Sequence, residues 1–553
     1  MTRGGLLLFA TALAVSAQSG GVISGRVTST AHGDPVAGAT VTLRGLDDGP
    51  AQTYITETAA DGRFSIANMV PGTYEPRPSK TGYEQRTPDH FATAKDFPPV
   101  TVEAGKATAP IELHLIPDGV VAGRVVDSDG DPVRHAQVEA QQYGYVSGKK
   151  QLRTLRGAQT DDRGEYRLFH LPPGKYWLHV QPSSRRNQPQ FQPRLRQLAG
   201  SAQMQNVPPP TGLAAAYYPG SPDVTHATEL QVAPGAELDG IDVRVTPERL
   251  YAIRGRVTGD GNKGNFSVFA QSLSPPEGRP NGFPMRIEND QYELSGIPPG
   301  KYAVIGQQFS NQQQPGPPVI DMPRQYARQM VEIVDRDVDN IDLTFEPGAL
   351  IKGVIKGEGS ASAKDAVNIN LTPADSGLMT FGMMFGGGAR VGTDGTFTLQ
   401  TAPGVYNVRV NGHQVYLKTV LIGKQAAPDR KIDTARLSGD LTLVVSNDYG
   451  KVEGTVVDEA GKPVFNANVT LIPDQRQDDL QERFRSALTK ADGKFSVAAV
   501  QPGEYRAYAW LGVEQGAPQD AEFRKPFEDR AVVVKVEPNG KQTVDLKVIQ
   551  PAQ

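Results

Sequence analysis

The sequence predicts an all-β protein in which five tandem two-sheet sandwich domains follow a signal peptide. Three observations support this prediction: two short motifs that each recur five times in the same order, an alternation of apolar and polar residues between them, and an apolar N-terminus. The motifs recur about every 100 residues, which is the size of one small domain.

The first motif is a glycine inside a run of apolar and β-branched residues. It recurs at Gly25, Gly123, Gly255, Gly353 and Gly454. The second motif is Pro-Gly-x-Tyr, and its tyrosines are Tyr74, Tyr176, Tyr302, Tyr406 and Tyr505. Repetition of two independent motifs in one order indicates a tandem-repeat architecture.

Short strands fill the space between the two motifs. Residues 40–44, 63–66 and 111–115 alternate apolar and polar side chains with the period of a half-buried strand. Asp-Gly pairs, such as Asp61-Gly62 and Asp492-Gly493, are typical of hairpin turns. About seven such strands in 100 residues predict an immunoglobulin-like sandwich of two packed sheets.

The motif tyrosine has two possible roles. Its hydroxyl could tie the strand to the preceding loop, as in a tyrosine corner. Alternatively, the ring is simply an inward-facing core aromatic, and the residues do not decide between the two.

The predicted division of the chain is as follows: a signal peptide at 1–17, then sandwiches at 22–117, 118–248, 249–347, 348–446 and 447–553. We call these sandwiches repeats 1 to 5. Repeat 2 contains an insertion at about 181–216, rich in Gln, Pro and Arg, which we expect to be a mobile loop. One repeat runs directly into the next, which predicts a semi-rigid rod.

The N-terminus has the layout of an export signal. Arg3 precedes an apolar stretch of about a dozen residues, and Val15 and Ala17 supply the small residues before a cleavage site. No other segment approaches the length of a membrane-spanning helix, so we expect no transmembrane segment after signal removal. The expected location is the periplasm, the outer cell surface or the extracellular medium.

Composition excludes several classes of function. The 553 residues include no Cys, which excludes disulfide scaffolds, thiolate metal sites and cysteine nucleophiles. A net charge of −4 is not that of a dedicated nucleic-acid binder. No HExxH, GxSxG or Walker motif occurs. We therefore expect a non-enzyme without cofactors and without a nucleic-acid partner.

The repeats resemble the carboxypeptidase regulatory-like domain, which has a transthyretin-like, carbohydrate-binding-like fold. Repeat 5 carries the pattern most fully: Gly454 to Asp458, Gly461 to Val464, Ala467 to Leu471, Asp492 to Val497 and Pro502 to Tyr505. The resemblance extends over nearly all of the chain after residue 17. It implies a non-catalytic module of the bacterial type that accompanies exported enzymes and receptors.

One acidic segment has part of the spacing of a calcium loop. Asp335, Asp337, Asp339 and Glu346 lie at positions 1, 3, 5 and 12 of such a loop. Position 6 is Asn340 where the loop needs glycine, and no helices flank the segment. These residues are weak calcium candidates, and an acidic turn explains them equally well.

The strand that follows Pro-Gly supplies the candidate ligand-binding residues. If the tyrosine faces inward, alternation turns Trp177 and His179 outward in repeat 2. The same register turns Arg506, Tyr508 and Trp510 outward in repeat 5. Exposed aromatic rows stack on sugar rings, but both Trp residues could instead pack against a neighbouring segment.

The functional prediction is non-catalytic binding in the cell envelope, most plausibly of a polysaccharide. Two alternatives stay open. One is a structural spacer or scaffold, and the other is an accessory subunit that binds another exported cell-envelope protein.

Overall fold

The computed structural model describes residues 20–47, 52–84, 98–146, 148–182, 211–259, 266–273, 283, 285–288, 290–308, 325–374, 388–474 and 483–551. The predicted signal peptide at 1–17 lies outside these residues. Strands dominate the described chain, and its helices are short, with six residues at most. The predicted all-β class is confirmed.

Repeats 1 and 2 each place their strands in two main sheets. In repeat 1 the sheets are β4–β1–β7 and β3–β2–β5–β6, with β1 Gly21–Ser29, β2 Thr40–Gly45, β3 Thr53–Glu57, β4 Arg63–Met69, β5 Gly72–Ser79, β6 Val100–Val102 and β7 Ile111–Leu115. In repeat 2 they are β11–β8–β16 and β10–β9–β12–β14, with β8 Gly119–Val126, β9 Gln137–Val146, β10 Lys149–Gln159, β11 Glu165–Leu171, β12 Gly174–Gln181, β14 Ala216–Tyr217 and β16 Glu237–Leu238.

Short elements complete repeat 2. They are β13 Thr211–Leu213, η1 Val224–His226, β15 Leu230–Val232, β17 Val243–Arg244 and β18 Pro247–Arg249. Most of the predicted mobile insertion, residues 183–210, lies outside the described residues. Toward its predicted end, β13 pairs with β18 and β14 pairs with β12.

Repeats 3 and 4 follow the same plan. The strands of repeat 3 are β19 Tyr251–Thr258, β20 Phe266–Ser272, β21 Met285–Glu288, β22 Gln291–Ile297, β23 Gly300–Gln308, β24 Gln325–Ile333, β25 Leu343–Thr344 and β26 Glu346–Pro347. The elements of repeat 4 are β27 Ala349–Glu358, η3 Ala363–Asp365, β28 Ala366–Pro373, β29 Gly388–Arg390, β30 Thr396–Thr401, β31 Val405–Gly412, β32 Tyr416–Ile422, β33 Gln425–Ala426, η5 Pro428–Arg430, β34 Lys431–Asp433 and β35 Leu441–Ser446.

Repeat 5 differs because its last strand joins the two sheets. Strand β42 pairs with the first strand, β36, and with β40, so the order is β38–β37–β40–β42–β36–β39. The elements are β36 Gly450–Val457, β37 Asn468–Pro473, β38 Arg485–Leu488, β39 Lys494–Val500, β40 Gly503–Trp510, η6 Ala517–Gln519, α3 Ala521–Arg524, η7 Lys525–Arg530, β41 Val532–Val536 and β42 Lys541–Ile549.

The recurring glycine of the first strand is required by close packing on two sides. In repeat 5 a Cβ on Gly454 would lie 1.7 Å from the carbonyl oxygen of Val544 and 3.0 Å from the ring of Phe495. The glycine pairs with Val544 of β42 in parallel and with Phe495 of β39 in antiparallel fashion. The same pairing with an aromatic residue recurs at Gly25, Gly123, Gly255 and Gly353. A side chain cannot fit between the strand and the ring that covers it.

Four of the five Pro-Gly-x-Tyr tyrosines form tyrosine corners. The hydroxyl groups of Tyr74, Tyr176, Tyr302 and Tyr505 each donate to the carbonyl oxygen four residues earlier, over 2.6–2.9 Å. Their rings lie in the cores at the same time. Both roles considered for the motif tyrosine are therefore correct for these four residues, because the ring packs in the core and the hydroxyl hydrogen-bonds to the preceding loop.

These buried tyrosines predict a loss of stability at alkaline pH. Burial raises the pKa of Tyr74 to about 12 and also raises the pKa of Tyr505. An unfolded tyrosine loses its proton near pH 10, whereas the folded one keeps it. Stability is therefore complete below pH 10 and falls above it, by up to about 1 kcal/mol per pH unit for each such tyrosine. Urea unfolding at pH 8 and pH 11 would measure the difference.

The variant Tyr505→Phe is the control for this prediction. It should cost about 1 kcal/mol at pH 8 through the lost hydrogen bond. It should also make the unfolding of repeat 5 less dependent on pH. An unchanged pH dependence in the variant would contradict the prediction for that residue.

Five large clusters of buried apolar side chains form the cores of the described chain. Each cluster draws its members from a single repeat, within residues 23–115, 121–245, 251–345, 351–445 and 452–546. The exact boundaries of five independently folding domains stay a prediction, which limited proteolysis between the repeats would test.

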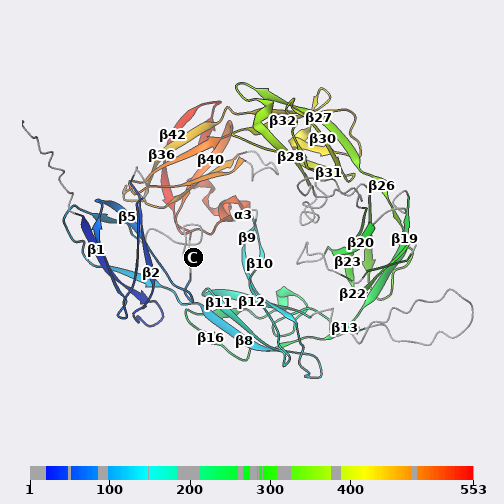
Figure 1. Ribbon diagram of the computed structural model, residues 1–553, viewed down its shortest axis with the longest axis horizontal. Coiled ribbons are helices and arrows are strands. Elements are labelled where there is room, and N and C mark those ends of the chain that lie inside the picture. Colours follow the sequence, from blue (N-terminus) through cyan, green and yellow to red (C-terminus); the bar gives the residue numbers. More distant parts are fainter. Residues whose placement is uncertain are drawn as a thin grey trace, which may run out of the picture.

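The repeats do not form a rod. In Figure 1 they follow one another around a loop, and α3 of repeat 5 lies beside the ends of β9 and β10 of repeat 2. Ring contacts join these segments, which are more than 350 residues apart in sequence. The expectation of a semi-rigid rod is therefore wrong for this structure, because it considered only joins between successive repeats.

Candidate functional site

The predicted aromatic row of repeat 5 has the predicted register but is not exposed. Tyr505 faces the core of the sandwich, and Tyr508 and Trp510 face the other side of the sheet. However, Tyr508 is 1% exposed and Trp510 is 0% exposed. The Trp510 indole donates to Thr470 Oγ1 over 2.9 Å. The expectation that Tyr508 and Trp510 present a stacking surface is therefore wrong for this structure.

A short helical segment of repeat 5 covers these aromatic residues. The Asp520 side chain caps α3 by accepting from the backbone N–H groups of Glu522 and Phe523. Phe523 and Phe527 then contact the Trp510 ring at centroid distances of 5.5 and 5.4 Å. The i, i+4 spacing of the two phenylalanines was the sequence signal for this cover, and the sequence analysis missed it.

Arg506, the third predicted residue of repeat 5, is partly exposed. Its guanidinium contacts the Asp474 carboxylate over 2.7 Å. Its side chain also interacts with the Tyr508 hydroxyl. Because Tyr508 and Trp510 are buried, the three residues do not form one open surface.

Of the two predicted binding residues of repeat 2, one is half-buried and the other is buried. Trp177 is half-buried and makes an edge contact with Tyr143 of β9, with ring centroids 4.9 Å apart. Tyr143 is 39% exposed, and the Lys150 ammonium lies 5.9 Å from its ring. Trp177 is thus the one predicted Trp that borders an exposed aromatic side chain.

His179 belongs to a buried polar cluster beside Trp177. His179 is 6% exposed, its ring contacts Tyr217, and its Nδ1 lies 3.8 Å from the Glu139 carboxylate. Gln141 and Thr154 also donate to that carboxylate. The expected exposure of His179 is therefore wrong, because neighbouring strands crowd this side of the sheet.

The hairpin of β9 and β10 docks against the helical segment of repeat 5. Tyr145 contacts Phe523 with ring centroids 5.8 Å apart, and Arg153 forms an ion pair with Glu514 at 3.3 Å. Gly148 lies so close to Gln519 that a Cβ there would come within 2.8 Å of the Gln519 Cβ. Burial raises the pKa of the Tyr145 hydroxyl, in agreement with this contact. The interface therefore joins repeats 2 and 5 directly.

The calcium candidates are not assembled into a loop. Asp337 and Asp339 both contact the Arg254 guanidinium, at 2.9 and 3.2 Å. Glu346 instead pairs with Tyr326 in β26 and β24. Among the residues that the structure describes, no three His, Asp or Glu side chains are placed to hold a metal ion. The arginine between the carboxylates explains their proximity without calcium, and Asp335 does not join them.

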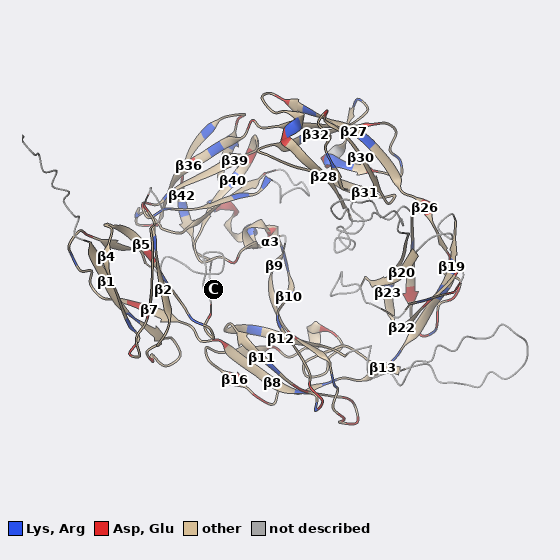
Figure 2. Cartoon of the chain, viewed as in Figure 1, with Lys and Arg blue, Asp and Glu red and all other residues tan. Residues whose placement is uncertain are grey.

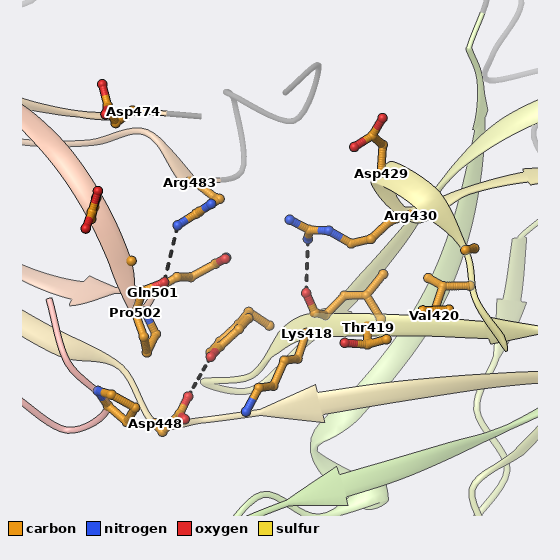
Figure 3. A pocket seen from close by; sticks show the side chains of 17 residues that line it. Lys418, Thr419, Val420, Asp429, Arg430, Asp448, Asp474, Arg483, Gln501 and Pro502 are labelled. Atoms are coloured by element: carbon orange, nitrogen blue, oxygen red, sulfur yellow. Dashed lines mark hydrogen bonds between the residues drawn. The ribbon is translucent and has the colours of Figure 1, made fainter. Parts of the chain in front are cut away.

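A cleft that the sequence analysis did not foresee lies between repeats 4 and 5 (Figure 3). Its volume is about 790 Å³. One wall comes from β32 and from residues 426–430, and the other comes from residues 501–504 with Arg483. Figure 3 shows the Arg430 side chain extending into the cleft from one wall, whereas the Arg483 guanidinium on the other wall is turned to the Pro502 carbonyl oxygen. No spacing in the sequence brings these two arginines together, because they belong to different repeats.

Charges of both signs are distributed over all the repeats in Figure 2. This agrees with the small net charge of −4. Among the described residues no helix is long and apolar enough to cross a membrane.

Several solved structures are similar to this chain at low identity. The minor pilin GBS52 of Streptococcus agalactiae is 12% identical with a TM-score of 0.22, over 40% of this chain and 95% of that one. The shaft pilin SpaA of Lactobacillus rhamnosus GG is 10% identical with a TM-score of 0.21, over 41% and 97%. BcpA, the major pilin subunit of Bacillus cereus, is 9% identical with a TM-score of 0.16, over 96% and 98%. No curated protein matches the chain.

The family assignment rests on sequence rather than on these structures. The carboxypeptidase regulatory-like domain matches residues 22–115, 120–208 and 451–547. These three regions cover just over half of the 553 residues, and they carry the glycine and tyrosine motifs whose packing is described above. The chain therefore belongs to the carboxypeptidase regulatory-like domain family.

Proposed function

We propose that this protein is a non-catalytic, exported scaffold of the cell envelope. The repeats supply rigid sandwiches, and the contact between repeats 2 and 5 holds them in a closed arrangement. This contact is the observation that carries the proposal, because a simple spacer needs no bond between distant repeats. A closed scaffold presents several sandwiches to neighbouring envelope proteins in one constant arrangement.

The proposal predicts that a double substitution at the interface opens the chain. Tyr145→Ala removes the ring contact with Phe523, and Arg153→Glu places like charges opposite one another at Glu514. Like charges at a partly buried interface oppose contact by several kcal/mol. Small-angle X-ray scattering of residues 18–553 should show a larger radius of gyration and a larger maximum dimension in the variant.

Arg134→Glu is the matched control, because Arg134 is exposed on a turn of the same repeat. It makes the same change of charge and should leave the scattering unchanged. If the unsubstituted protein scatters as an extended rod, or if the double variant keeps its dimensions, the closed scaffold is wrong.

A second candidate function is carbohydrate binding on repeat 2. It is supported by the half-buried Trp177 beside the exposed Tyr143, with the Lys150 ammonium next to the Tyr143 ring. Aromatic faces pack on the apolar faces of sugar rings, and nearby polar groups bond to the hydroxyl groups. Repeat 5 is not part of this candidate, since its Trp510 is covered.

Fluorescence can test this candidate, because Trp177 and Trp510 are the two Trp residues of the chain. In a Trp510→Phe background, Trp177 is the single indole that reports binding. A titration with soluble polysaccharides should then give a saturable change in emission. Binding to insoluble polysaccharides should be lost in Trp177→Ala and Tyr143→Ala. Binding that persists in both variants would place any sugar site elsewhere.

A further inference from the structure

The Arg483 side chain has a well-defined position in the wall of the cleft between repeats 4 and 5. The guanidinium lies over the Tyr505 ring at 5.4 Å and donates from Nη2 to the Pro502 carbonyl oxygen over 3.2 Å. A Cβ on Gly503 would lie 2.2 Å from that Nη2. Gly503 has φ +147, a value that glycine adopts readily. The Pro-Gly-x-Tyr motif of repeat 5 therefore leaves room for an arginine beside the cleft.

Arg483 also has an unsatisfied donor. Its Nε is buried and has no hydrogen-bond partner in the described structure. A buried donor without an acceptor is unfavourable, so an acceptor placed at this position would be stabilised. The guanidinium presents its donors in a planar fork that matches carboxylate and phosphate groups.

The opposite wall places a second guanidinium toward the same space. Arg430 Nη1 donates to the Leu417 carbonyl oxygen over 3.0 Å, which anchors the side chain to β32. Asp429 and Arg430 both have positive φ, at 52° and 55°. Two successive non-glycine residues in this region are energetically costly, and such strain concentrates at ligand-binding positions.

The acidic residues of the cleft have positively charged or hydrogen-bonding partners of their own. Asp474 contacts Arg506 at 2.7 Å, and Asp448 accepts from the Tyr416 hydroxyl over 2.5 Å. Glu504 lies opposite Lys535 in the pairing of β40 and β41. In Figure 3 the Asp429 side chain points away from the space between the arginines.

We propose that this cleft binds the oxyanion group of a ligand, a carboxylate or a phosphate, between Arg483 and Arg430. Leu417, Val420 and Pro502 line the cleft beside the arginines and would contact the apolar part of the ligand. The proposal is independent of the scaffold function and of the sugar candidate on repeat 2, because it uses residues of repeats 4 and 5 alone.

Isothermal titration calorimetry of residues 18–553 with three probes tests the proposal. The probes are D-glucuronate, inorganic phosphate and uncharged D-glucose. D-glucuronate or phosphate should bind saturably at low ionic strength and more weakly as NaCl is added, whereas D-glucose should not bind. Tighter binding of D-glucuronate identifies a carboxylate ligand, and tighter binding of phosphate identifies a phosphorylated one.

Two variants locate the site. Arg483→Ala should weaken binding at least tenfold, and Arg483→Lys should restore only part of it, because lysine keeps the charge and loses the fork. Arg530→Ala is the matched control, since Arg530 pairs with Glu459 outside the cleft. Circular dichroism and thermal unfolding would verify that each variant is folded. If neither anion binds, or if a folded Arg483→Ala variant binds as the unsubstituted protein does, the proposal is overturned.

Discussion

Replacing Gly454 with valine should destabilise repeat 5 by about 3 kcal/mol or more, one of the largest effects expected for a single substitution in this chain. A Cβ there would lie 1.7 Å from the Val544 carbonyl oxygen, which belongs to the backbone of a paired strand. That strand, β42, cannot move away without loss of its pairing with β36, and β42 joins both sheets of the repeat.

Urea unfolding followed by Trp510 emission measures this effect, in a Trp177→Phe background so that a single indole reports repeat 5. Gly461→Asn is the control, because Gly461 is also a glycine of repeat 5 but has positive φ with nothing near its Cβ position. Asn tolerates this conformation, so the control should cost less than about 1 kcal/mol. Equal effects of the two substitutions would show that the first strand is not closely packed at Gly454.

Replacing Trp510 with alanine should cost about 3–5 kcal/mol, the range for truncating a fully buried aromatic side chain. The variant loses the ring contacts with Phe523 and Phe527 and leaves the Thr470 hydroxyl without its donor. The covering segment should loosen with it, because the Trp510 ring is the shared contact of Phe523 and Phe527. Calorimetry would show a lowered transition for repeat 5.

Trp177→Ala is the comparison, since Trp177 lies on the same face of the corresponding strand in repeat 2 but is only half-buried. Its cost should be below about 2 kcal/mol. Acrylamide quenching should likewise separate the two residues, with Trp510 protected and Trp177 accessible. Similar destabilisation and similar quenching of both would contradict the different environments described here.

The local sequence pattern was sufficient to predict the strand register and to identify the motif residues. Alternation placed Tyr176, Leu178 and Val180 on one side of β12, and all three belong to the core of repeat 2. The same alternation could not predict whether Trp510 is exposed. A strand pattern specifies which side of the sheet a residue faces, but not what covers that side. In repeat 5 the cover lies in residues 511–531, which follow the strand, and only the packing of this segment decides the burial.

The sequence by itself determined the repeat, the all-β class and the positions of the glycine and tyrosine motifs, because each depends on residues inside one repeat. Tertiary structure alone decided the contact of Tyr145 with Phe523 and the position of Arg430 and Arg483 in one cleft. The reason is physical. The alternation of apolar and polar residues is a property of each single strand. These two pairs instead depend on the angles at which successive sandwiches join, and small changes in those angles accumulate along the chain.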